Sequence, residues 1–128
     1  MRILVTGAAG FIGYHLCKSL IEDNYEVLGV DNINDYYDPS LKLARLKQLK
    51  RYKIFKFEKV DISDRDSIAK PFQSFKPNKV VNLAAQAGVR YSIENPYAYM
   101  ESNLVGFLNI IELCRNNNVE GFIYASSS

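Results

Sequence analysis

The sequence predicts an α/β fold in which a doubly wound parallel sheet carries helices on both faces. Strand-like apolar runs alternate with amphipathic helix patterns along the 128 residues, which is one domain's length. The first strand runs directly into a glycine-rich turn and a helix, and the second strand ends in an acid. Five strands separated by four helices require parallel pairing, and right-handed crossovers then give the strand order 3-2-1-4-5.

The first half of the chain contains two strands, two helices and a polar loop. The expected elements are strand Arg2–Thr6, helix Phe11–Asn24, strand Glu26–Asp31 and a helix beginning at Pro39. Asp38 is expected to cap the second helix, because a side-chain acceptor followed by proline in the first turn is typical of a helix start. The apolar stripe of this helix consists of Leu43, Leu46 and Leu49.

The second half repeats the alternation. The expected strands are Lys53–Val60, Lys79–Ala84 and Gly121–Ala125. Ser63 and Asp66 resemble a capping box for the third helix, in which Pro71 predicts a kink and which Pro77 is expected to end. The fourth helix is expected to begin at Asn95-Pro96, with an apolar face of Leu104, Phe107, Leu108, Ile111 and Cys114.

The turn after the first strand predicts a dinucleotide site. Gly7, Gly10 and Gly13 are spaced at three and three, between a strand and a helix. Gly7 allows the tight turn, Gly10 lets a phosphate approach the backbone, and Gly13 lets the helix pack closely. Asp31 follows about 20 residues later, where a carboxylate accepts from ribose hydroxyls. Because this carboxylate would repel a 2′-phosphate, NAD is predicted over NADP.

The composition of the chain bears on three other classes of function: nucleic-acid binding, membrane insertion and metal binding. The net charge of +2 does not indicate a nucleic-acid partner, and no apolar run is long enough to span a membrane. Cys17 and Cys114 fall in helical apolar patterns, which predicts buried thiols and a cytoplasmic protein. The sequence contains no cluster of cysteines and histidines of the kind that would predict a metal site. A basic run is interpreted as a solvated helix face; it comprises Lys42, Arg45, Lys47, Lys50, Arg51, Lys53 and Lys56.

The chain resembles the N-terminal part of the extended short-chain dehydrogenase/reductases, the nucleotide-sugar epimerases and dehydratases with a Rossmann-type domain. The residues that carry the resemblance are Thr6–Gly13, Asp31-Asn32, Asp61-Ile62, Asn82–Ala85, Asn103 and Tyr124–Ser128. Within that superfamily it most resembles UDP-glucuronate 4-epimerases, through the strings 31–38 and 84–92.

The resemblance implies a set of site residues. Asp61 would accept from the adenine amino group beside Ile62, and Ala84 and Ala85 would let the cofactor lie against the backbone. Ser127 would be the catalytic residue that hydrogen-bonds the sugar hydroxyl. The implied NAD-binding residues are Gly7, Gly10, Phe11, Ile12, Gly13, Asp31, Asn32, Asn34, Asp61, Ile62, Ala84 and Ala85. For Asn32 and Asn34, loop turn chemistry is an alternative explanation.

The family's base is a tyrosine in a Tyr-x-x-x-Lys pair after the fifth strand. Two strings here have that spacing, Tyr14 with Lys18 and Tyr52 with Lys56. The first lies on the phosphate-binding helix, and the second flanks a strand, where four residues span about 13 Å. Neither fits the role. We therefore expect residues 1–128 to be an N-terminal NAD-binding fragment that lacks the base and the sugar-binding part, and that is inactive alone.

The implied activity is NAD-dependent 4-epimerisation of a UDP-glucuronate-like nucleotide sugar by transient oxidation at C4. A 4,6-dehydratase or a decarboxylase of the same superfamily, a non-catalytic NAD-binding module, and nucleic-acid binding through the basic run are the alternatives. Relatives often form homodimers through the third and fourth helices. The apolar residues that fit either such an interface or the core are Phe72, Phe75, Phe107 and Leu108.

Overall fold

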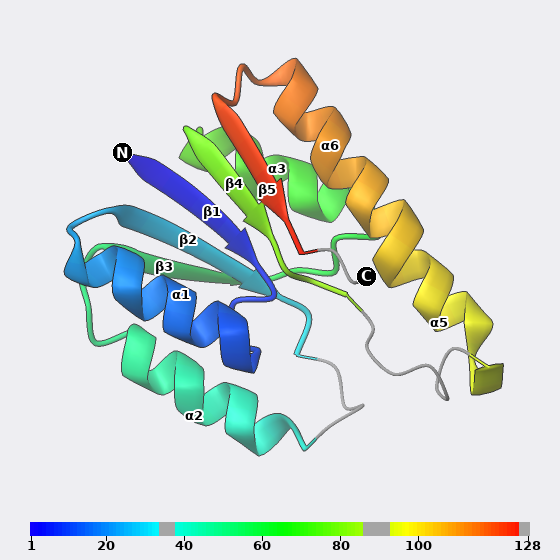
Figure 1. Cartoon of the computed structure of the whole chain (residues 1–128), viewed down its shortest axis with the longest axis horizontal. Helices are drawn as coiled ribbons and strands as arrows, with labels where there is room; N and C mark the ends of the chain where they lie inside the picture. Colours follow the sequence, from blue (N-terminus) through cyan, green and yellow to red (C-terminus); the bar gives the residue numbers. More distant parts are fainter. Residues whose placement is uncertain (34–37, 86–92, 126–128) are drawn as a thin grey trace.

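The computed structural model describes residues 1–33, 38–85 and 93–125. Its centre is a five-stranded sheet in the order β3-β2-β1-β4-β5, with every neighbouring pair parallel (Figure 1). The strands are β1 Arg2–Thr6, β2 Glu26–Asp31, β3 Phe55–Lys59, β4 Lys79–Asn82 and β5 Gly121–Tyr124. The predicted fold class and strand order are confirmed.

Helices cover both faces of the sheet. On one face lie α1, Phe11–Glu22, and α2, Pro39–Leu49. On the other lie α3, Arg65–Phe75, and α6, Gly106–Asn116. Figure 1 shows α6 as the end of one longer coil, which starts with α5, Pro96–Met100, and passes through a π-helical segment, Glu101–Val105.

Two hydrophobic cores result from the alternation of side chains along the strands. Ile3 and Val5 of β1 point to the face of α1 and α2, whereas Leu4 between them points to the face of α3 and α6. Because β1 lies in the middle of the sheet, all three of these residues are buried. The central strand is therefore apolar on both sides, as expected for a covered parallel sheet.

The helix starts follow local capping chemistry. Asp38 caps α2 as predicted, accepting from the Ser40 N–H at 2.9 Å, and this bond lowers the pKa of the Asp38 carboxyl. The predicted capping box of α3 is wrong, because Asp64 is the cap and accepts from the Ser67 N–H at 3.3 Å. The helix continues through Pro71, and Lys76 ends it in a left-handed conformation directly before Pro77.

The predicted apolar face of the fourth helix is only partly correct: Cys114 packs against the core and Phe107 and Ile111 are half-buried, but the centre of the buried face lies elsewhere. Ile110 is fully buried and Gly106 is buried beside it, whereas Leu104 and Leu108 are 55% and 57% exposed. The reason is a close approach at Gly106, where an added methyl group would lie 2.6 Å from the Ile62 side chain. The helix therefore packs through a glycine, which a search for large apolar residues passes over.

The four residues proposed for either the core or an interface differ in burial. Phe72 is fully buried in the core, and Phe75 packs against that core. The ring of Phe107 contacts the rings of Phe122 and Tyr124 on β5 at 5.8 and 5.1 Å between centroids. Only Leu108 of the four is strongly exposed.

The two edge strands differ in character. The outer strand β3 exposes the charged side chains of Lys56, Glu58 and Lys59. At the opposite edge, β5 exposes Ile123 and Tyr124, which are 62% and 53% accessible. Charged side chains protect a sheet edge against pairing with another chain, and apolar ones do not.

Cys17 is buried, as predicted, whereas Cys114 is half-buried. Burial raises the pKa of the Cys17 thiol to about 12 and that of Cys114 to about 11. The two thiols belong to the cores on opposite faces of the sheet. In the ranges that the structure describes, no helix is both long and apolar enough to cross a bilayer, and no acid, cysteine and histidine group is arranged to hold a metal.

The packing of α6 predicts different costs for two substitutions on one helix. Ile110→Ala removes a fully buried side chain and is expected to lower the free energy of unfolding by about 2–5 kcal/mol. Leu108→Ala removes an exposed side chain and is expected to change it by about 0.5 kcal/mol or less. Urea unfolding measures both values, and equal costs would contradict the orientation of α6.

Candidate functional site

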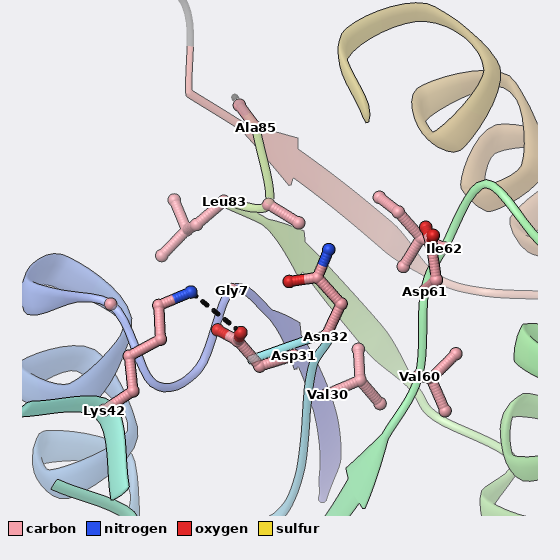
Figure 2. Close-up of a pocket in the computed structure, with 12 residues that line it drawn as sticks. Gly7, Val30, Asp31, Asn32, Lys42, Val60, Asp61, Ile62, Leu83 and Ala85 are labelled. Atoms are coloured by element: carbon pink, nitrogen blue, oxygen red, sulfur yellow. Dashed lines mark hydrogen bonds and ion pairs between the residues drawn. The ribbon is translucent and has the colours of Figure 1, made fainter. Parts of the chain in front are cut away.

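A hollow opens at the carboxyl ends of the strands, where β1 lies between β2 and β4 (Figure 2). It is a partly open hollow that is lined by both polar and apolar residues. Parallel sheets bind ligands at this switch in strand order. The residues that line it are Gly7, Gly10, Val30, Asp31, Asn32, Lys42, Val60, Asp61, Ile62, Leu83, Ala84 and Ala85.

Glycines shape the wall formed by the turn after β1. Gly7 has φ +70°, and an added methyl group there would lie 2.9 Å from the Ala84 nitrogen. A methyl group at Gly13 would lie 2.0 Å from the Gly7 carbonyl oxygen, so α1 lies directly against the turn. At Gly10 the same addition would meet only the Gly7 oxygen, at 3.3 Å. Packing thus requires glycine at positions 7 and 13, whereas Gly10 has room for a side chain and faces the hollow.

The first turn of α1 begins at this wall. Phe11 and Ile12 do not line the hollow, and their side chains are 66% and 67% exposed. The first N–H groups of any helix have no acceptor within that helix. Phe11 and Ile12 can therefore offer backbone donors to a ligand, and Gly13 also allows the close packing of α1.

Asp31 connects three parts of the site. Its Oδ2 accepts from the Ala9 N–H of the glycine turn at 3.1 Å. Its Oδ1 accepts from the Ile33 N–H at 2.8 Å and from the Lys42 ammonium of α2 at 3.0 Å. The carboxylate is almost fully buried and lines the hollow. The acid predicted from spacing alone is thus fixed by two backbone donors and one cation.

Lys42 is a residue of the hollow that the sequence interpretation missed. Figure 2 shows its ammonium group reaching the Asp31 carboxylate from α2. Arg45, one turn later, donates to the Ala9 carbonyl at 3.0 Å. The interpretation of the basic run as a solvated helix face is therefore wrong for these two cations. The sequence interpretation also missed three apolar residues that line the hollow, Val30, Val60 and Leu83.

The opposite wall of the hollow is the segment after β3. Asp61 is exposed, and its Oδ1 accepts from the N–H and the hydroxyl of Ser63 at 3.0 and 2.7 Å. Ile62 is buried beneath α6. The Asn109 side-chain amide donates to the Ile62 carbonyl at 2.8 Å. The backbone at Ile62 is therefore held by a helix on the far side of the sheet.

A buried hydroxyl sets where β4 ends. The Thr6 hydroxyl donates to the Asn82 side-chain oxygen and accepts from the Leu83 and Ala84 N–H groups, both at 3.0 Å. These two N–H groups are turned to the hydroxyl, so β4 stops at Asn82 and not at Ala84 as predicted. The bend brings Ala84 and Ala85 to the rim of the hollow.

Some predicted residues do not belong to this arrangement. Asn34 and Ser127 lie outside the described residues, so their predicted roles stay predictions. Tyr14 packs against the core beneath α1, and Lys56 lies in β3, paired with Leu28. Neither residue lines the hollow. The two Tyr-x-x-x-Lys strings thus lie where packing and surface roles were expected.

The Thr6 network predicts a substitution with a local signature. Thr6→Val keeps the shape of the side chain but leaves the Ala84 N–H without its acceptor and the Asn82 side-chain oxygen without its donor, whereas the Leu83 N–H keeps the Thr6 carbonyl as an acceptor at 3.2 Å. This loss is expected to cost about 1–3 kcal/mol. Thr6→Ser keeps the hydroxyl and is expected to cost about 1 kcal/mol or less for the lost methyl group. Amide hydrogen exchange at Ala84 should accelerate only in Thr6→Val. Unchanged exchange there would contradict the role given to the hydroxyl.

Comparisons with known proteins agree with this geometry. The chain is 56% identical over 128 residues to Protein CapI of Staphylococcus aureus, spanning all of this chain and 38% of that protein. It is 45% identical over 125 residues to a UDP-glucuronate 4-epimerase of Thermodesulfobacterium geofontis, spanning 98% of this chain and 39% of that protein. The chain thus spans about two fifths of the length of these relatives.

A solved structure of a related protein has the same fold as this chain. The UDP-glucuronic acid 4-epimerase of Bacillus cereus, in complex with UDP-glucuronic acid and NAD, superimposes with a TM-score of 0.90 at 35% identity. The match covers all of this chain and 40% of that one. Among protein families, the one described as GDP-mannose 4,6 dehydratase matches residues 4–128. The chain therefore belongs to the GDP-mannose 4,6-dehydratase family, as the predicted resemblance to nucleotide-sugar epimerases and dehydratases implied.

Proposed function

We propose that residues 1–128 form the NAD-binding domain of a nucleotide-sugar 4-epimerase that acts on a UDP-glucuronate-like substrate. The observation that carries the proposal is the convergence of the glycine turn, the start of α1 and Asp31 on one hollow at the switch in strand order. The relatives support the same conclusion, since two of them are UDP-glucuronate 4-epimerases and one was solved with NAD.

The residues of the hollow fit a dinucleotide in their chemistry. An added methyl group at Gly10 would meet only one protein atom within 4 Å, so space for a pyrophosphate lies on its other side. Asp31 offers acceptor oxygens for ribose hydroxyls. Asp61 and Ile62 offer an acceptor and an apolar side chain for the adenine, and the small Ala84 and Ala85 leave the backbone accessible.

Within that proposal, the chain's own residues bind and orient. NAD, when bound, supplies the hydride chemistry at C4 of the sugar. The glycine turn and the first turn of α1 would hold the pyrophosphate, and Asp31 would fix the adenosine ribose. We assign Ser127 to hydrogen-bonding of the sugar hydroxyl, from its position in the family motif.

Turnover by these 128 residues alone is expected to be absent. The base that the family resemblance implies is a Tyr-x-x-x-Lys pair, and neither of the two strings with that spacing in these residues lines the hollow. Purified chain incubated with NAD and UDP-glucuronate should therefore bind NAD but give no UDP-galacturonate by chromatography. Measurable product would contradict the proposed division of the chain into binding and catalytic parts.

Three glycine substitutions test the cofactor site while separating binding from folding. Gly10→Ala should fold, because its methyl group meets only the Gly7 oxygen, but it should weaken NAD binding at least tenfold by filling the phosphate space. Gly13→Ala should fail to fold, because its methyl group would lie 2.0 Å from that oxygen. Isothermal titration with NAD and thermal unfolding measure the two effects.

The matched control is Gly121→Ala, at the start of β5. An added methyl group there makes ordinary contacts with the Lys79 side chain, at 3.6 Å and beyond. Gly121 is at the amino end of β5, whereas the hollow is at the carboxyl ends of the strands, and Gly121 does not line it. It should leave both NAD affinity and the melting temperature unchanged. If Gly10→Ala folds and binds NAD as tightly as this control, the proposed phosphate site is wrong.

A further inference from the structure

The strongest additional feature of the site is the ion pair between Lys42 and Asp31. The Lys42 ammonium lies 3.0 Å from Asp31 Oδ1, and the two side chains are 18% and 3% exposed. Both line the hollow, and Figure 2 shows them together beside Gly7. The lysine is held there by α2, whose start is fixed by the Asp38 cap. Lys42 is therefore part of the wall that the ribose would meet.

The pair keeps unused hydrogen-bonding capacity on both partners. A carboxylate has about four acceptor positions, and Asp31 uses three in the contacts with Ala9, Ile33 and Lys42. An ammonium group has three N–H donors, of which Lys42 uses one on Asp31 in its contacts with the described residues. A ribose at this corner would thus meet an acceptor and a donor together.

The charges at this corner differ from those that the sequence suggests. A lone carboxylate repels a 2′-phosphate, which carries nearly two negative charges at neutral pH. Here Asp31 faces the Lys42 ammonium, and the Arg45 guanidinium lies nearby, bonded to the Ala9 carbonyl and 6.0 Å from the Phe11 ring. The other acid of the lining, Asp61, is on the segment after β3. Among the residues that the structure describes, two cations therefore accompany one carboxylate at the ribose corner.

We propose that Lys42 binds the adenosine ribose beside Asp31 and sets cofactor specificity, so that this chain binds NADP as well as NAD, with NADP the weaker ligand. The proposal rests on the proposed function, because both cofactors would place their ribose at Asp31. It adds to the expectation drawn from Asp31 alone, under which NAD is favoured because the carboxylate repels a 2′-phosphate: with Lys42 beside Asp31, NADP still binds.

The test compares the two cofactors on four proteins by isothermal titration. They are the unsubstituted chain, Lys42→Met, Lys42→Arg, and Lys47→Met, the last removing an exposed lysine of the same helix that does not line the hollow. The unsubstituted chain should bind NADP within about a hundredfold of its NAD affinity. Lys42→Met should raise the ratio of the NADP to the NAD dissociation constant at least tenfold, while the other two variants should leave it within about threefold.

A second ligand pair isolates the phosphate itself. ADP and 2′,5′-ADP differ only at the 2′ position and both lack the nicotinamide. The preference of Lys42→Met for ADP over 2′,5′-ADP should increase at least tenfold, and added salt should narrow the difference between the variants by screening the charge. An unchanged preference in a folded Lys42→Met protein that binds NAD would overturn the proposal.

A further variant keeps the test valid if Lys42→Met does not fold. Asp31→Asn preserves the side-chain shape and removes the negative charge that opposes Lys42, so it should improve NADP binding relative to NAD at least tenfold. No change in that ratio would overturn the proposal. If the folded, unsubstituted chain binds neither cofactor, the proposed function fails, and the role of Lys42 fails with it. NAD binding without any effect of Lys42 would reject only the latter.

Discussion

The helix α1 lies directly against the turn that follows β1, because neither Gly7 nor Gly13 has a side chain to hold the two apart. At the contact, the space that a methyl group on Gly13 would need is already filled by the Gly7 carbonyl. This approach brings the first turn of α1 to the carboxyl end of the central strand. The other walls of the hollow lie on either side of this turn, because β2 and β4 flank β1 in the sheet.

The side chains of Asp31 and Thr6 connect the glycine turn and the end of β1 to the neighbouring strands. Asp31 joins the end of β2 to the glycine turn and to α2 through three hydrogen bonds. Thr6 joins the end of β1 to the bend after β4. Both groups are buried, and a buried polar group that lost its partners would be costly. The site is therefore held by the same interactions that stabilise the sheet ends.

Signals that lie close together in the sequence could be interpreted correctly. The bounds of β1 and β2 match the prediction, since each apolar run is ended by a residue with a local reason to stop it, Gly7 or Asp31. The cap at Asp38 and the helix end before Pro77 are equally local. The strand order followed from the handedness of crossovers alone.

Features that depend on distant contacts could not be predicted. The bend after β4 depends on the Thr6 hydroxyl, which is 77 residues away from Leu83. The orientation of α6 depends on Gly106 meeting Ile62, and the position of Lys42 depends on how α2 lies against the end of β2. In each case the deciding side chain looks ordinary in the sequence, and only its partner gives it a role.

The difference between the two borders of the sheet has a practical consequence for the isolated chain. In the described residues, β5 has a hydrogen-bonded neighbour on one side only, and its outward groups include the apolar Ile123 and Tyr124. Such a border can add a strand from another molecule, whereas the lysines and glutamate of β3 oppose it. Concentrated solutions of these 128 residues should therefore self-associate through β5. Ligand titrations are best made with the protein dilute in the cell and the small molecule in the syringe.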